Sequence, residues 1–78
     1  MSPQELLEHA LKEIKSLKKD EIFMVKDLFV GYLWNREDKA DRLTVGTLFL
    51  NHVKSHPENI KILDKTSSNQ QKYQIIKT

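Results

Sequence analysis

The hydrophobic pattern of the chain changes at Pro57, and this change limits the folds that it can adopt. Before Pro57, apolar residues recur at helical spacing over two long segments. After it, residues 60–63 and 70–76 alternate between apolar and polar side chains on either side of a polar turn, which is typical of a β-hairpin. Proline disfavours helical backbone at the preceding residue, so the sequence predicts a helical part followed by a hairpin.

The first half of the chain contains signals for two helices and a short strand. Ser2 and Glu5 form a predicted capping box at the start of the first helix, residues 2–18. A short apolar run bounded by charges predicts a strand at residues 22–25. A second, short helix is predicted at residues 26–31, where a glycine is expected to end it.

A third helix is predicted at residues 41–54, and the wing hairpin at residues 60–76. Val45 and Leu48 are expected on the exposed side of the third helix. Its apolar face is expected to hold Leu43, Gly46, Leu50 and Val53, with Phe49 beside them. The order helix, strand, helix, helix, strand, strand predicts an α+β fold, the winged helix-turn-helix, as one compact domain over residues 1–78.

Composition agrees with one small globular domain that has a basic end. The chain has 78 residues, of which 38% are hydrophobic and 31% charged. Residues 59–78 hold four lysines and one acidic residue, whereas residues 1–58 hold nine basic and ten acidic residues. A basic hairpin favours an anionic partner, although lysines that keep a pair of strands soluble would give the same pattern.

Catalytic and metal chemistry have few candidate residues. The chain has two glycines and no cysteine, so it lacks a phosphate-binding glycine loop, disulfides and thiolate ligands. His52 and His56 have the spacing of metal ligands on a helix, but Pro57 is expected to fray that turn. We therefore expect ordinary surface histidines, with no metal site, no cofactor and no enzyme activity.

The predicted solvent face of the third helix does not favour duplex DNA. In a duplex-reading helix-turn-helix, this face enters the major groove and carries side chains that hydrogen-bond to bases. Here it is expected to hold Asp41, Thr44, Leu48, Asn51 and His52, with Val45 at its border. Because these residues include neither lysine nor arginine, a duplex-binding regulator is the third hypothesis.

Single-stranded DNA requires cations along the strand and rings on which bases stack. The candidate stacking residues are Tyr32, Trp34 and Tyr73, although a single tryptophan in a small domain is often a core residue. The candidate phosphate contacts are Arg36, Lys39, Arg42, Lys65 and Lys72. Further candidate contacts in the hairpin turn, which a generic polar turn explains equally well, are Ser67, Ser68, Asn69, Gln70 and Gln71.

Three blocks of the sequence together resemble a known family: FVGYLWNR at residues 29–36, RLTVGTLFL at residues 42–50 and LDKTSSNQQKY at residues 63–73. They resemble the short winged-helix single-stranded-DNA-binding proteins of Gram-positive phages and cassette-type mobile elements, long described as a domain of unknown function. The resemblance implies DNA binding through the Tyr32/Trp34 motif and the wing. It also implies a hydrophobic pocket and a role in replication or transfer of the element. Val45 and Leu48 on the third helix are the candidates for lining such a pocket or for a dimer contact.

The leading hypothesis is a non-enzymatic protein that binds single-stranded DNA with little sequence preference. The alternative is a protein-interaction module that binds a host or element protein through Val45 and Leu48 on the third helix. Other replication proteins of the element are further expected partners. Since the sequence has no cysteine and no apolar run that could span a membrane, the chain is expected in the cytoplasm. Its oligomeric state is left open between a monomer and a homodimer.

Overall fold

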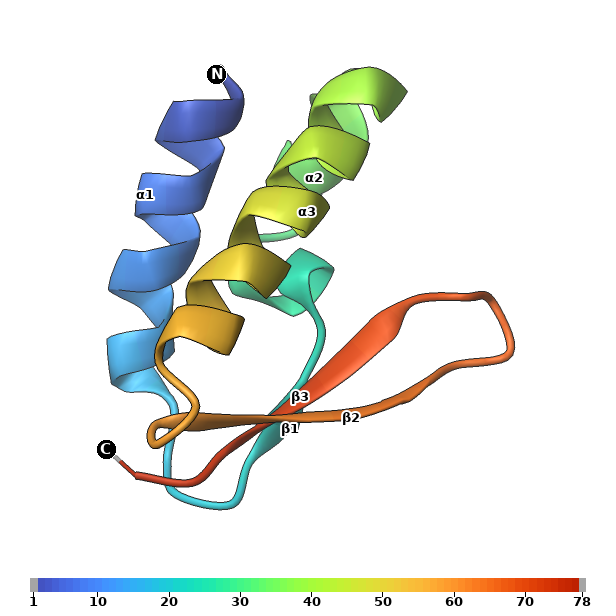
Figure 1. The fold of residues 1–78 in the computed structure, drawn as a ribbon. Helices are drawn as coiled ribbons and strands as arrows, with labels where there is room; N and C mark the ends of the chain where they lie inside the picture. The colour runs from blue at the N-terminus through green and yellow to red at the C-terminus, as the bar shows by residue number, and fades with distance from the viewer. Residues whose placement is uncertain (1, 78) are drawn as a thin grey trace.

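The computed structural model describes residues 2–77 and places three α-helices on one side of a three-stranded antiparallel sheet (Figure 1). The helices and the sheet share one hydrophobic core. The chain is therefore a small, compact α+β domain. In chain order, its elements are α1 (Pro3–Glu13), the 3-10 helix η1 (Ile14–Ser16), β1 (Ile22–Phe23), the 3-10 helix η2 (Val25–Leu28), α2 (Leu33–Arg36), α3 (Lys39–Ser55), β2 (Ile60–Lys65) and β3 (Gln71–Ile75).

Helix α1 begins at the predicted capping box, which is confirmed. The Ser2 amide donates to the Glu5 carboxylate (3.0 Å), and the Glu5 amide donates to the Ser2 hydroxyl oxygen (3.2 Å). Hydrogen bonds from the backbone amide of Ser2, and secondarily from its side chain, hold the pKa of Glu5 below its usual value. The helix is shorter than the predicted residues 2–18, because a 3-10 turn to Ser16 follows it and Leu17 is extended.

The single helix predicted at residues 26–31 is wrong, since two short turns are present instead. One turn is η2, and the other is α2, which begins at Leu33. Gly31 lies between them with a φ of +49°, a left-handed backbone conformation that favours glycine. A right-handed helix does not continue through such a residue, so the segment divides there.

Strand β3 lies at the centre of the sheet, between β1 and β2. Phe23 of β1 and Ile62 of β2 are both register partners of Tyr73. Directly paired residues point to the same side of a sheet, so these three side chains lie on one face. The strand predicted at residues 22–25 contains two residues, because η2 already begins at Val25.

The core joins the helices to the inner face of the sheet. The Tyr73 ring stacks on Phe23, with 5.6 Å between the ring centroids, and meets the ring of Phe49 edge-on at 5.0 Å. These aromatic contacts connect β1, β3 and α3. The buried residues are Leu6, Ala10, Phe23, Leu28, Phe29, Val45, Phe49, Val53, Ile60, Tyr73 and Ile75.

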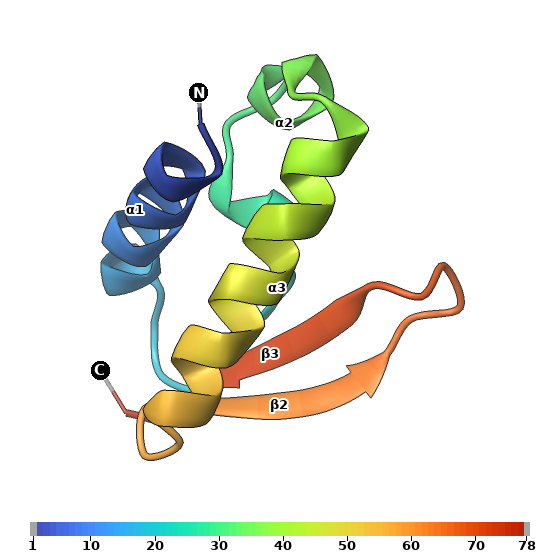
Figure 2. The ribbon, with the colours of Figure 1, turned by 45° about the horizontal axis from the view of Figure 1, so that its top comes forward.

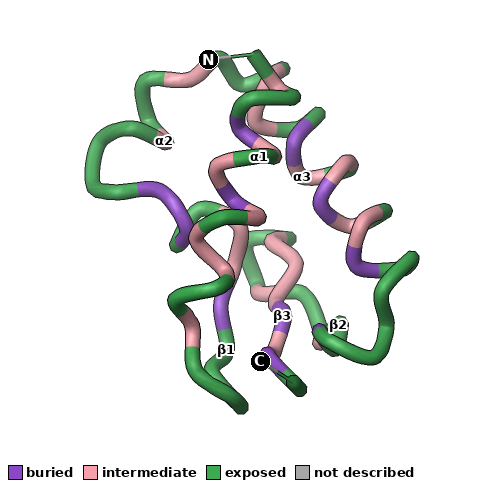
Figure 3. The backbone as a smooth tube through the Cα atoms, turned by 90° about the vertical axis from the view of Figure 1, so that its left-hand side faces the viewer, coloured by how far each residue is buried: buried purple, intermediate pink, exposed green. Residues whose placement is uncertain are grey.

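Helix α3 is rotated relative to its predicted apolar face, and it begins two residues before the predicted range 41–54. Val45, Phe49 and Val53 recur at four-residue spacing and are buried (Figure 3), whereas Leu43 is 65% exposed. The prediction that Val45 is exposed and Leu43 buried is therefore wrong. Apolar residues occur on every side of this helix, so the sequence pattern alone does not determine which side faces the core.

Candidate nucleic-acid interface

Tyr32, directly before α2, has a side chain that is 60% exposed. The guanidinium carbon of Arg36 lies 4.1 Å from the centroid of the Tyr32 ring, which is a cation–π contact. Because α2 is one helical turn long, residues i and i+4 at its two ends lie on the same side. The pair therefore combines an exposed ring with a positive charge, as single-strand binding requires.

Trp34 of α2 is half-buried and packs against the core. Its ring centroid lies 5.0 Å from that of Phe29, and Phe29 stacks on His9 of α1 at 4.9 Å. These three rings connect α2 to α1. Trp34 therefore has a packing role, and part of its surface remains accessible.

The next candidate residues lie on α3. Lys39, the first residue of the helix, is exposed and remains a candidate phosphate contact. Arg42 is half-buried, and its Nε atom is buried without a hydrogen-bond partner in the part of the chain that the structure describes. Leu48 is half-buried, while Val45 belongs to the core and is lost from the predicted partner surface.

The wing, formed by β2, β3 and the loop between them, extends away from the helices (Figure 2). Its loop is held by hydrogen bonds from the Thr66 amide to the Gln70 carbonyl (2.8 Å) and from the Asn69 amide to the Thr66 carbonyl (2.9 Å). Asn69 has a φ of +66°, which asparagine tolerates better than most residues. Ser67, Ser68 and Asn69 are exposed at the tip and can contact a strand, whereas Gln70 is half-buried.

The two lysines of the wing differ in exposure, since Lys65 is exposed and Lys72 is half-buried. Between them in sequence, the side-chain Nε2 of Gln71 donates to the backbone carbonyl oxygens of Leu63 and Lys72. The register of β2 is irregular between Ile62 and Lys65, so Gln71 serves a carbonyl at a β-bulge. Gln71 therefore stabilises the wing, a role that differs from its predicted contact with DNA.

The prediction that Tyr73 offers a stacking surface is wrong, because its side chain is 1% exposed. Successive side chains of a strand point to opposite faces, so Tyr73 faces the core while Lys72 faces away from it. Burial raises the pKa of the Tyr73 phenol to about 12. Tyr73 is therefore a core residue that connects the wing to the helices.

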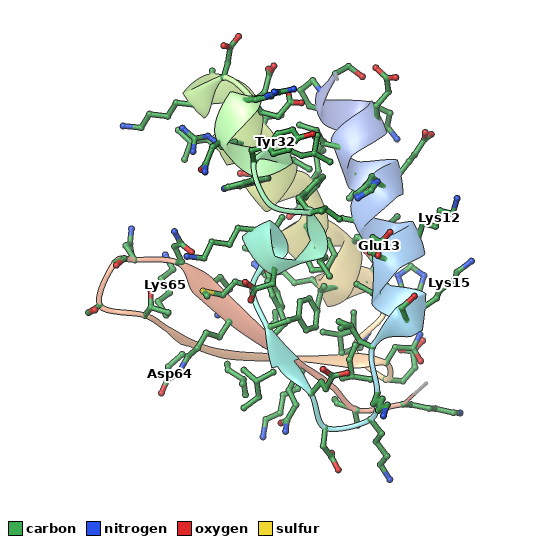
Figure 4. The ribbon with its side chains drawn as sticks, turned by 180° about the vertical axis from the view of Figure 1, so that it is seen from behind. Lys12, Glu13, Lys15, Tyr32, Asp64 and Lys65 are labelled. Carbon is green, nitrogen blue, oxygen red and sulfur yellow. The ribbon has the colours of Figure 1, made fainter. Side chains whose placement is uncertain are left out.

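Lys26 is an exposed cation that sequence reasoning does not single out. It belongs to η2, which lies between α2 and the wing in Figures 1 and 4. In Figure 4, the label Tyr32 marks the start of α2 and the label Lys65 marks the wing. Nothing in the sequence reveals this position, because Lys26 is distant along the chain from the wing. The fold thus brings the element that carries Lys26 between α2 and the wing.

A pocket of about 450 Å³ lies where the ends of α1 and α3 meet the sheet. It lies away from the loop of the wing, since Lys15 of its lining and Lys65 at the loop end of β2 are on opposite sides in Figure 4. The residues around it do not include Val45 or Leu48, which are the predicted lining. The pocket is lined by Leu11, Ile14, Ile60 and Ile75 and by the polar residues Lys15, His52, Asn59 and Lys77.

Within residues 2–77, no group of three or more histidine, cysteine, aspartate or glutamate side chains could hold a metal ion. None of the helices in this range is both long enough and apolar enough to cross a membrane.

A family model described as "Domain of unknown function (DUF1413)" matches residues 8–74. No curated protein and no solved structure matches the chain. The matched residues extend from within α1 to within β3 and include both the Tyr32–Arg36 pair and the wing. This description assigns no activity to the family.

Proposed function

We propose that this chain, which belongs to the DUF1413 family, is a non-enzymatic winged-helix protein that binds single-stranded DNA with little sequence preference. The strand lies across α2, η2 and the wing. The resemblance of the three sequence blocks suggests a role in replication or transfer of a phage or mobile element. The exposed Tyr32–Arg36 pair is the observation that carries the proposal.

The order and pairing of the elements support a winged helix. Three α-helices precede the hairpin, and β1 pairs with β3, so the early strand completes the sheet next to the wing. This is the arrangement expected of a winged helix-turn-helix. Helix α2 is one turn long and follows η2, so the second helix of the motif is reduced in this chain.

The surroundings of Tyr32 support a role in base stacking. Val30 and Leu33, close to it in sequence, are also exposed, so apolar side chains remain in contact with water at this end of the molecule. Exposed apolar groups that cluster often mark binding surfaces. A base stacked on an aromatic ring contributes about 1–3 kcal/mol. The Arg36 guanidinium lies over one face of the Tyr32 ring, so the base stacks on the other face and the cation offers its charge to a neighbouring phosphate.

Exposed cations support contacts along the phosphate backbone. Lys26, Lys39 and Lys65 lie on η2, at the start of α3 and on the wing, respectively. All three are exposed and therefore able to reach a strand. Contacts of this kind position a nucleic acid without reading its sequence, which agrees with a low sequence preference.

The exposed side of α3 gives little support to duplex reading. The hydroxyl groups of Thr44 and Thr47 donate to the carbonyl oxygens of the preceding turn, at 2.9 and 3.2 Å. Their donor hydrogens are therefore not available to bases. Asn51 and Lys54 remain as exposed donors on this side, and Leu43 adds an apolar side chain.

Fluorescence anisotropy with labelled oligonucleotides tests the proposal. We expect single strands of unrelated sequence to bind alike and more tightly than the corresponding duplexes. The logarithm of affinity should fall with the logarithm of salt concentration, with a slope of about −0.7 per phosphate neutralised. Absence of single-strand binding at low salt would contradict the proposal, and tighter binding to one duplex sequence would favour a regulator.

Matched variants locate the binding surface. Tyr32→Ala is expected to weaken single-strand binding by about tenfold or more, because one stacking contact is lost. Lys65→Ala and Lys72→Ala should each weaken binding evenly across sequences and reduce the salt slope. Lys12→Ala is the control, since Lys12 is an exposed lysine of α1 on the opposite side from Lys65 in Figure 4. Equal losses for Lys12 and Lys65 would show that only net charge matters.

A protein-interaction module is the second candidate, and the 450 Å³ pocket is the observation that favours it. Its apolar lining carries ammonium groups from Lys15 and Lys77, which match an acidic peptide with apolar side chains. Val45 is buried, so the partner surface predicted on α3 loses this residue. Lys15→Glu should abolish binding of such a peptide and leave binding of single-stranded DNA unchanged.

A further inference from the structure

His52 lies in the last turn of α3, and His56 directly follows the helix as its C-cap residue. The two rings contact each other, with centroids 4.5 Å apart and ring planes inclined by 27°. As predicted from Pro57, the helix ends before His56, whose φ of −133° and ψ of 59° are not helical. The His56 amide still donates to the Val53 carbonyl (3.0 Å), and the ring contact places the two imidazoles side by side at the end of α3.

A hydrogen bond determines which ring nitrogen of His56 carries the proton. Nδ1 of His56 lies 3.0 Å from the carbonyl oxygen of His52. A carbonyl oxygen accepts and never donates, so Nδ1 is protonated and Nε2 of the neutral ring keeps its lone pair. Histidines that bind metals commonly donate their second ring N–H to a carbonyl or carboxylate in this way.

We propose that His52 and His56 chelate a divalent transition-metal ion through their imidazole nitrogens, with water completing the coordination shell. Imidazole suits zinc, nickel and copper ions. Zinc–nitrogen bonds of about 2.0–2.1 Å require two ligand nitrogens about 3 Å apart. The two rings, with centroids 4.5 Å apart, come from residues four apart in sequence, the spacing at which two histidines bind zinc on a helix. This site is separate from the proposed DNA surface.

The side chains around the two histidines set the expected affinity. In the described range, no third histidine, aspartate or glutamate joins them, so the site is an open two-ligand chelate. Lys15 and Lys77 line the same pocket as His52, and their charges oppose a second cation. The carbonyl end of α3 acts in the opposite direction, because the helix dipole favours cations there. We therefore expect binding in the micromolar range, weaker than at an enclosed zinc site.

The protonation state of His52 agrees with a ligand role. Burial, and secondarily the neighbouring His56, lowers the pKa of His52 from its usual value of 6.5. Both effects disfavour the charged form of this ring.

Titration of the full chain with zinc chloride, followed by NMR, tests the proposal without any substitution. The ring-carbon protons of His52 and His56 should shift together and saturate at one zinc ion per chain. The protons of His9 serve as an internal control, because its ring stacks on Phe29 at a different place on α1. Unchanged signals for His52 and His56 at millimolar zinc, or a shift of His9 alone, would overturn the proposal.

Isothermal titration calorimetry with variants measures the contribution of each ring. His52→Gln and His56→Gln should each lower zinc affinity by about tenfold or more, because one imidazole remains where two bound the ion. His9→Gln is the matched control and should bind zinc as the unaltered chain does. Equal affinities for the unaltered chain and both pair variants would overturn the proposal, whatever the NMR result.

Discussion

The two tyrosines of the chain lie in opposite environments. Tyr73 is 1% exposed and packs between Phe23 and Phe49, whereas Tyr32 is 60% exposed and carries Arg36 over its ring. Both tyrosines are candidate stacking residues from the sequence. The structure leaves the Tyr32 ring accessible to a ligand and buries the Tyr73 ring.

Local geometry explains the difference. Arg36 follows Tyr32 by four residues across one helical turn, and such a spacing puts both side chains on the same side. Lys72 directly precedes Tyr73 in a strand, and adjacent strand residues point to opposite faces. A cation beside an aromatic residue therefore indicates a binding surface only when its spacing fits the secondary structure that contains it.

Truncation of the two tyrosines should show the largest contrast. Tyr73→Ala is expected to lower the free energy of unfolding by about 3–5 kcal/mol, as for other large aromatic residues in cores. That loss approaches the total stability of a small domain, so this variant should be largely unfolded at 25 °C. Tyr32→Ala should change the free energy of unfolding by less than about 0.5 kcal/mol. Far-UV circular dichroism without denaturant should show the loss of folded structure in Tyr73→Ala, and urea denaturation monitored by Trp34 fluorescence measures the stability of Tyr32→Ala. A folded Tyr73→Ala variant that is as stable as Tyr32→Ala would contradict the assigned environments.

Alkaline pH should distinguish the same two residues through a smaller change in the free energy of unfolding. Burial raises the pKa of Tyr73 from 10.0 to about 12, so between these values the folded chain keeps a proton that the unfolded chain releases. The contribution of this proton to stability is therefore complete below pH 10 and is lost as pH rises through about 12, by about 2–3 kcal/mol at 1.36 kcal/mol per pKa unit. Urea midpoints over this range should lose this dependence in Tyr73→Phe and keep it in Tyr32→Phe. An unchanged dependence in Tyr73→Phe would contradict the assignment.

Two apolar residues of α3 extend the comparison to the helix. Val45 is fully buried and Leu43 is 65% exposed, the reverse of the predicted arrangement. Val45→Ala should lower the free energy of unfolding by about 2 kcal/mol, which combines the lost methyl groups with the cavity that they leave. Leu43→Ala removes a larger side chain and should cost less than about 0.5 kcal/mol. A greater loss for Leu43→Ala in urea denaturation would restore the predicted helix face.

These cases show how far the sequence determines the structure. The capping box at Ser2 and the hairpin after Pro57 were predictable, because each depends on residues that are close in the chain. The orientation of α3 was not, since its apolar residues surround the helix and only packing against α1 and the sheet selects Val45. The position of Lys26 between α2 and the wing likewise depends on the tertiary fold.

Exposure alone does not make a residue unimportant for stability, and Ser2 tests this point with the smallest effect. Its hydroxyl accepts from the Glu5 amide and its own amide donates to the Glu5 carboxylate, so both groups satisfy the start of α1. Ser2→Ala should cost about 1 kcal/mol in urea denaturation, a typical value for an N-cap serine. Ser68→Ala, at the exposed tip of the wing, is the matched control and should cost less than about 0.5 kcal/mol. Equal costs would mean that the capping box does not stabilise α1 in solution.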